Sequence, residues 1–185
     1  MAYIKIFKIA ILMVCCLLSG STFATQLPMQ LPIQLSTQKP EQLSSDDMDV
    51  EYQEIDVNAK NLQGCSGLML AAHYGHLSIT ELLLIHGAKL EDRDNKGRTA
   101  LMGAAYSDHI DVVNVLLQAG ADINAQNIVG WTALMLATSQ GHVKIVKFLL
   151  EHQADVSITN KNGEKALDIA IYKKQPEIVK LLKRH

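Results

Sequence analysis

The sequence predicts an all-α solenoid of stacked helix-turn-helix units joined by β-hairpin turns. Three observations predict it. Four glycines recur at intervals of 33 residues: Gly64, Gly97, Gly130 and Gly163. Each glycine is followed by a short apolar segment rich in alanine, and then by a second apolar segment that ends in leucines. A period of this size is typical of repeat proteins, in which one unit cannot bury its apolar face without its neighbours.

Residues 1–24 predict a signal peptide. Lys5 and Lys8 precede an unbroken apolar run at 9–18, and Thr22 and Ala24 provide the small residues that favour cleavage after Ala24. A helix of this run spans about 15 Å, half of a hydrocarbon core of about 30 Å. We therefore expect export to the periplasm or beyond the cell, with no stable membrane anchor after cleavage. A permanent anchor is the alternative.

Composition after residue 24 excludes two classes of protein. The chain carries 17 Lys and Arg against 19 Asp and Glu, so removing Lys5 and Lys8 leaves 15 against 19 and a charge near −4. No basic excess is available to neutralise phosphates, so we expect no nucleic-acid partner. Cys65 is the one cysteine beyond the signal segment, which rules out a fold held by internal disulfides.

Residues 25–49 predict a Gln/Pro-rich linker. Glutamine recurs every fourth residue from Gln26 to Gln42, a spacing that suits a helix. Pro28, Pro32 and Pro40 interrupt it, because each removes a backbone donor and clashes with the preceding turn. We expect an extended or disordered segment, with a capping helix near 41–54 as the alternative.

The repeated motifs resemble those of the ankyrin repeat family, here of an exported bacterial type. The second unit reads Gly-Arg-Thr-Ala-Leu-Met-Gly-Ala-Ala at 97–105, then Ile-Asp-Val-Val-Asn-Val-Leu-Leu at 110–117, then Gly-Ala-Asp-Ile-Asn at 120–124. The resemblance implies a repeat domain at 50–185. Its expected parts are a partial unit at 50–60, repeats at 61–93, 94–126 and 127–159, and a capping repeat at 160–185.

Each recurring residue has a physical reason. Glycine allows a positive φ in the turn, and the hydroxyls of Ser66, Thr99 and Thr132 can cap the first helix of each unit. Paired alanines such as Ala104 and Ala105 let neighbouring units approach closely. The leucine pairs are expected to be buried between units: Leu83/Leu84, Leu116/Leu117 and Leu149/Leu150. Met69, Met102 and Met135 replace the family's histidine, so packing replaces its hydrogen bonds.

Histidine and cysteine offer little chemistry. The resemblance gives His76, His109 and His142 a structural role in which the ring caps a turn. His73 and His76 have a spacing that suits metal ligands, which is the weaker alternative to a structural role. Cys65 lacks an activating base in its motif. No catalytic or phosphate-binding motif accompanies them, so we expect no enzyme, no cofactor and no metal.

The candidate site is a protein-binding surface. The family binds partners through loop tips and the exposed face of the first helices, and residues of the types common in hot spots mark these positions. We centre the predicted site on Trp131, the one tryptophan, with the apolar tip residues Ile128 and Val129 beside it. The remaining predicted members are Lys96, Arg98, Tyr74, Tyr106 and Tyr172. Packing of Trp131 across neighbouring tips is the alternative.

The leading functional prediction is therefore a non-enzymatic, monomeric adaptor or scaffold that is exported and binds another protein. Two alternatives stay open. One is a metal- or redox-linked protection factor that supports an envelope oxidative-stress enzyme through His73, His76 and Cys65. The other is a secreted effector that binds host proteins.

Overall fold

The computed structural model describes residues 56–185, which form eight α-helices in four consecutive pairs. The predicted signal peptide, the predicted linker and residues 50–55 lie outside the described residues. The first helices of the pairs are α2 (Gly67–His73), α4 (Ala100–Tyr106), α6 (Ala133–Gln140) and α8 (Ala166–Tyr172). The second helices are α3 (Leu77–Ile85), α5 (Ile110–Gln118), α7 (Val143–Glu151) and α9 (Pro176–Leu182).

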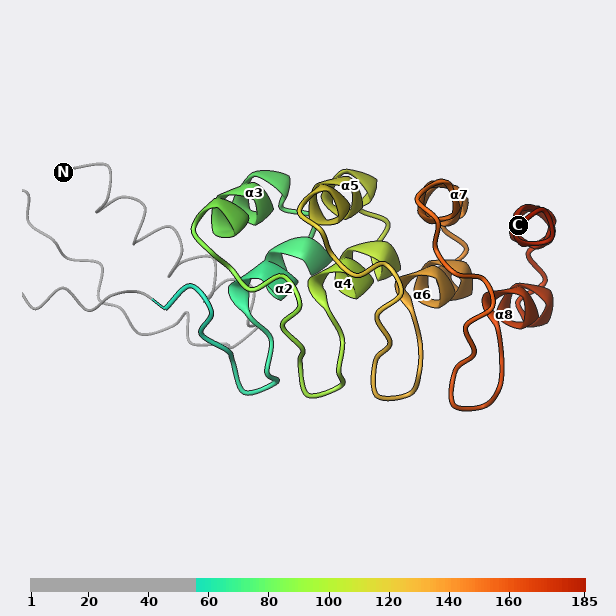
Figure 1. The fold of residues 1–185 in the computed structure, drawn as a ribbon, viewed down its shortest axis with the longest axis horizontal. Helices are drawn as coiled ribbons and strands as arrows, with labels where there is room; N and C mark the ends of the chain where they lie inside the picture. The colour runs from blue at the N-terminus through green and yellow to red at the C-terminus, as the bar shows by residue number, and fades with distance from the viewer. Residues whose placement is uncertain (1–55) are drawn as a thin grey trace, which may run out of the picture. The chain divides into compact units, whose positions relative to one another are not determined.

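The helix pairs stack side by side in two layers. In Figure 1, α2, α4, α6 and α8 form one layer, and the second helices form the other. Helix contacts run within each pair and between equivalent helices of neighbouring pairs, as from α2 to α4 and from α4 to α6. The predicted all-α repeat solenoid is thereby confirmed. Within the described part of the chain, no helix is both long and apolar enough to cross a membrane.

Side-chain hydroxyl groups cap the N-termini of α2, α4 and α6, the first helices of the first three pairs. Ser66, Thr99 and Thr132 adopt extended backbone conformations, and their side chains accept hydrogen bonds from the N–H groups of Met69, Met102 and Met135. These bonds satisfy amides that have no partner within the helix. The capping prediction is confirmed for all three residues, while the fourth helix begins after Lys165 with no side-chain cap of this type.

The loops before the first helices are tight turns rather than hairpins with strands. In the loop before α4, the Asp94 N–H donates to the Arg98 carbonyl at 3.1 Å, and Gly97 between them has a φ of +71°. The same bond recurs in the other three loops. In residues 56–185 only Lys60 and Ser66 form a β-bridge, so the predicted β-hairpins lack extended strands.

Hydrogen bonds between equivalent positions tie the repeats together. Lys60 Nζ donates to the Arg93 carbonyl, Arg93 Nη1 to the Gln126 carbonyl, and Gln126 Nε2 to the Thr159 carbonyl, each 33 residues on. A second series joins a side-chain oxygen of Asn58, Glu91 or Asn124 to the N–H of the residue 31 positions later. Hydrogen bonds between neighbouring repeats therefore recur with the same 33-residue period as the sequence motifs.

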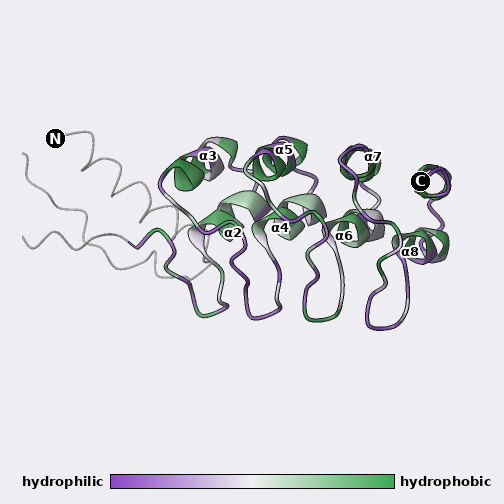
Figure 2. Cartoon of the chain, viewed as in Figure 1, coloured by the Kyte–Doolittle hydropathy of each residue, from purple (hydrophilic) through white to green (hydrophobic). Residues whose placement is uncertain are grey.

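The core lies between the two layers and between neighbouring pairs. The alanine pairs are buried completely, and Met102 and Met135 are each 1% exposed. Figure 2 shows the apolar residues concentrated in the helices. The predicted burial of the leucine pairs holds fully only for the third repeat, because Leu84 and Leu117 are half-buried. Both of these side chains still pack against the buried core.

The histidines that precede the second helices do not cap those helices. His76, His109 and His142 stand at the N-cap positions, and none of their side chains forms a cap hydrogen bond. His142 Nε2 donates instead to the Tyr106 carbonyl at 2.9 Å, a bond between neighbouring repeats. The His142 ring thus caps the C-terminal end of α4 in the preceding repeat, as expected of a ring that caps a turn, rather than the helix that it precedes.

Candidate protein-binding surface

The loop tips form one continuous edge of the stack, because backbone hydrogen bonds join each tip to the next. The bonds are Asn95 N to Gln63 O at 3.0 Å, Ile128 N to Lys96 O at 3.1 Å, and Lys161 N to Val129 O at 3.1 Å. Figure 1 shows the four loops projecting on the same side of the first helices. The backbones of neighbouring tips are therefore held in a fixed arrangement relative to one another.

Three apolar side chains stand exposed on this edge: Leu62 on the first tip, which is 96% exposed, and the neighbouring pair Ile128 and Val129 on the third tip. Ile128 is 54% exposed and Val129 is 49% exposed, while their backbones are bonded to both neighbouring tips. In Figure 2 the tip of the loop before α6 has the colour of apolar residues. Because the backbone of this tip is already ordered by its bonds, little backbone entropy is lost on binding, which suits a contact with another protein.

Trp131 lies at the base of the same tip. Its side chain is half-buried and packs against the hydrophobic core. Its backbone closes the turn, since its N–H donates to Asn127 Oδ1 at 2.9 Å and its carbonyl accepts from Asn127 N at 3.0 Å. Trp131 therefore supports the tip and is only partly exposed, whereas Ile128 and Val129 are exposed.

Lys96 and Arg98 lie on the neighbouring tip, where a buried carboxylate organises the turn. Asp94 Oδ1 accepts from the N–H groups of Lys96 and Arg98, each at 2.8 Å. Asp94 Oδ2 accepts from the Arg98 guanidinium at 2.6 and 2.7 Å. The Asp94 side chain is 3% exposed and that of Arg98 is 44% exposed. Arg98 is thus engaged by Asp94, and Lys96 is the freer cation of the two.

Asp94 was missed by the sequence reasoning, although a signal for it exists. The equivalent positions in the other repeats hold Asn61, Asn127 and Asn160, whose side-chain oxygens accept the same two backbone bonds. Only the second repeat adds a charge here, and Arg98 four residues on compensates it. Burial alone would raise the pKa of Asp94, but hydrogen bonds from Arg98 and Lys96 outweigh it and hold the pKa below its ordinary value.

Substitution of Asp94 by asparagine tests this turn through its pH dependence. A carboxyl whose folded pKa is depressed stabilises the fold above its unfolded pKa, near 3.9, and loses that contribution as pH falls toward its folded pKa. We expect wild type to lose on the order of 1 kcal/mol more stability than Asp94→Asn between pH 6 and pH 3. Urea unfolding at both pH values measures this, and parallel pH profiles would contradict it.

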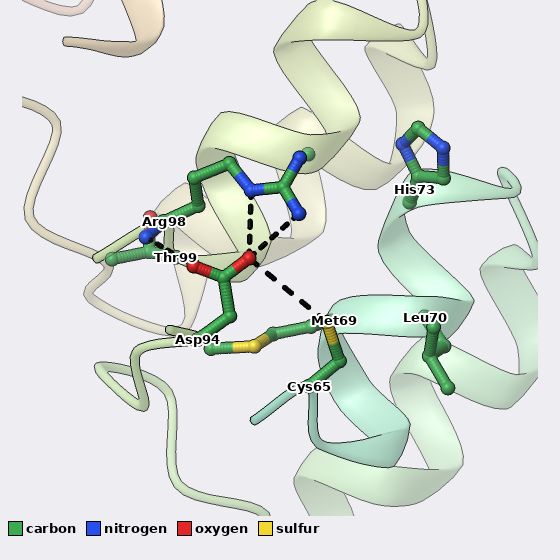
Figure 3. Close-up of a pocket in the computed structure, with 8 residues that line it drawn as sticks. Cys65, Met69, Leu70, His73, Asp94, Arg98 and Thr99 are labelled. Carbon is green, nitrogen blue, oxygen red and sulfur yellow. Dashed lines mark hydrogen bonds and ion pairs between the residues drawn. The ribbon is translucent and has the colours of Figure 1, made fainter. Parts of the chain in front are cut away.

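A small pocket opens beside this turn, between the first and second repeats (Figure 3). It has a volume of about 90 Å³ and is lined by Cys65, Met69, Leu70, His73, Asp94, Arg98, Thr99 and Gly103. The Cys65 thiol lies 4.0 Å from Asp94 Oδ2. Burial raises the pKa of Cys65, and the Asp94 charge raises it further. Cys65 is therefore held as a thiol, which weakens it as a nucleophile and metal ligand.

His73 and His76 belong to an aromatic surface near the ends of the first helices. The His73 ring lies 5.0 Å from the Tyr74 ring and 6.4 Å from the Tyr106 ring, and the Tyr74 and His76 rings are 6.3 Å apart. His73 Nδ1 and the Ser107 hydroxyl are 2.9 Å apart. Burial lowers the pKa of His73, as does the nearby Arg98 charge. Throughout residues 56–185, no three His, Cys, Asp or Glu side chains are grouped to hold a metal.

The predicted site thus divides into groups. Lys96 and Ile128 are joined through the bonded tips, and Val129 and Trp131 continue the same edge. Tyr74 is 47% exposed and Tyr106 is 44% exposed. Both rings lie beside the His73 ring, and together they form a second surface. Tyr172 stands apart at the end of α8, 83% exposed.

The stacked helix pairs with a bonded edge of loop tips define a repeat-solenoid interaction protein. A family model described as ankyrin repeats in three copies matches residues 42–127 and 125–185. The chain belongs to the ankyrin repeat family. Proteins of this family are protein–protein interaction modules and are generally not enzymes. No curated protein is similar enough to the chain to count as a match.

Proposed function

We propose that this protein is a monomeric, non-enzymatic adaptor that binds another protein through the tips of its second and third repeats. The observation that carries the proposal is the pair of exposed apolar side chains, Ile128 and Val129, on an edge bonded from tip to tip. Lys96 on the adjoining tip adds a positive charge. Membership of a family of interaction modules supports the same function.

We further propose that the adaptor acts outside the cytoplasm, in the periplasm or beyond the cell. The charged start, short apolar run and small residues of 1–24 support this location. The thiol of Cys65 suits that environment, because a raised pKa slows reaction with disulfides and oxidants.

The double variant Ile128→Asp/Val129→Asp tests the proposed surface. Both side chains are exposed, so the fold should tolerate the two aspartates. The apolar contact with the bound protein should not tolerate them. Burying an aspartate without a partner is unfavourable, and we expect at least about a tenfold loss of affinity for the bound protein. Affinity capture of the tagged protein from the envelope fraction, with quantitative mass spectrometry of the captured partner, measures the loss.

Ile85→Asp is the matched control for this variant. Ile85 is 79% exposed at the end of α3 and lies outside the loop tips. The control should capture the partner as wild type does, and all three proteins should give the same circular dichroism spectrum. Equal capture by wild type and the double variant would place the binding surface elsewhere.

A further inference from the structure

Two lysines flank the exposed apolar pair of the third tip, one on each neighbouring tip. The Lys96 carbonyl accepts from the Ile128 N–H at 3.1 Å, and the Lys161 N–H donates to the Val129 carbonyl at 3.1 Å. The third and fourth tips are also packed closely, because a Cβ at Gly130 would lie 2.9 Å from Lys161 N. The order along the edge is therefore one lysine, two apolar residues and a second lysine.

Both of these lysine side chains are exposed and unpaired. Neither ammonium group forms an ion pair or a hydrogen bond within residues 56–185. They differ in this from the neighbouring Arg98, whose guanidinium is bonded to Asp94. Because the ammonium group of a lysine stands on a flexible four-carbon stem, each can reach a group that is bound over Ile128 and Val129.

The loops that form the edge carry more positive than negative charge. They hold four Lys and Arg against two Asp and Glu, whereas the other residues of 56–185 hold ten against eleven. Neither carboxylate is bonded to a lysine, since Asp94 is paired with Arg98 and Glu164 accepts from Asn160 Nδ2 at 2.8 Å. The four loops span residues 61–66, 94–99, 127–132 and 160–165.

We propose that the bound protein presents an acidic segment to this edge, with apolar side chains over Ile128 and Val129 and Asp or Glu on each side of them. This inference rests on the proposed function, because it names the chemistry of the partner at the same surface. A partner that covers the apolar pair displaces water from the two ammonium groups beside it, which is unfavourable unless carboxylates pair with them. A basic or uncharged segment of the same shape would leave both charges without partners.

The separation of the lysines sets the spacing of the expected carboxylates. Hydrogen-bonded residues of neighbouring strands have Cα atoms about 5.5 Å apart, and consecutive Cα atoms are about 3.8 Å apart, so the Cα atoms of Lys96 and Lys161 are about 15 Å apart. An extended chain covers this distance in about four or five residues. The expected segment is therefore short, with apolar residues between two acidic positions.

A synthetic peptide tests the proposal on the purified full-length protein. The probe is a short fluorescent peptide in which a central Leu-Ser-Leu is flanked on each side by two glutamates and then by a Gly-Ser spacer. In one control peptide lysine replaces each glutamate, and in the other serine replaces each leucine. Fluorescence anisotropy should show saturable binding of the glutamate peptide that weakens with added salt, and at least about tenfold weaker binding of both controls.

Charge exchange assigns the binding to the two lysines. Lys96→Glu/Lys161→Glu should weaken binding of the glutamate peptide at least about tenfold and should gain binding of the lysine peptide. The matched control Lys144→Glu/Lys180→Glu makes the same change at exposed lysines of α7 and α9, which lie outside the loop tips. This control should bind both peptides as wild type does, and all three proteins should give the same circular dichroism spectrum.

Capture of the partner separates this proposal from the proposed function. If Ile128→Asp/Val129→Asp abolishes capture while Lys96→Glu/Lys161→Glu keeps it, the edge binds a protein without acidic groups, and only the present proposal fails. If both variants capture the partner as wild type does, both proposals fail.

Four results with the purified protein would also overturn the proposal. The first is no saturable binding of the glutamate peptide, and the second is equal binding of the glutamate and lysine peptides. The third is binding of vesicles with anionic headgroups that charge exchange abolishes while the glutamate peptide does not bind, which would assign the edge to a membrane surface. The fourth is concentration-dependent self-association by sedimentation velocity that charge exchange abolishes, which would assign the edge to a second copy of the chain.

Discussion

Leu116→Ala should lower the free energy of unfolding by about 2–5 kcal/mol. Leu116 is 0% exposed in α5, where the contacts of its helix reach both neighbouring repeats through α3 and α7. The substitution removes apolar contacts and leaves a cavity that the rigid stack cannot fill completely. Because repeats are stabilised mainly by their neighbours, damage to this repeat should weaken the repeats on both sides.

Urea unfolding followed by circular dichroism measures the effect. Ile85→Ala is the control, because Ile85 is an exposed aliphatic side chain on a second helix and should change the free energy of unfolding by less than about 0.5 kcal/mol. Equal destabilisation by the two variants would show that the repeats do not depend on a shared core.

Gly97→Ala should destabilise the protein by more than the same change at an otherwise similar turn glycine. Gly97 has a φ of +71°, and a Cβ at this position would lie 2.9 Å from Ile128 N and 3.0 Å from Ile128 Cγ2. The clash falls on the Ile128 N to Lys96 O bond that joins two tips. Backbone strain of about 1–2 kcal/mol and loss of a bond worth about 1 kcal/mol should therefore add.

Gly163→Ala isolates the first of these two contributions. Gly163 has a φ of +80°, yet a Cβ there would meet nothing within 4 Å, because no described tip follows it. We expect this control to show the backbone strain alone. Thermal or urea unfolding compares the two variants, and equal losses would mean that the bonds between tips contribute nothing to stability.

Much of the fold could be predicted because it depends on residues that recur in register. The turn glycines, the hydroxyls of Ser66, Thr99 and Thr132, and the small alanines each act locally, so their residue type alone indicates their role. The 33-residue period then places equivalent residues next to one another along the stack. Local signals and one repeat length are sufficient to specify helix pairs and their order.

Features that depend on neighbours across the stack could not be predicted in the same way. The partial exposure of Leu117, the bridging bond of His142 and the packing of Trp131 depend on how closely adjacent repeats approach. Asp94 differs from the equivalent asparagines by one negative charge. Because its side chain is buried, this charge is paired with Arg98, and the sequence pattern alone did not indicate that pairing.

The central claim is that the edge of loop tips holds another protein, and a crosslinking map tests it most directly. A photo-reactive amino acid is placed at Val129 in one protein and at Ile85 in another, both exposed in the free molecule. Crosslinking in cells of the source organism, followed by mass spectrometry, should give a defined partner at Val129 and none at Ile85. The same adducts at both positions, or adducts at Ile85 alone, would contradict the claim.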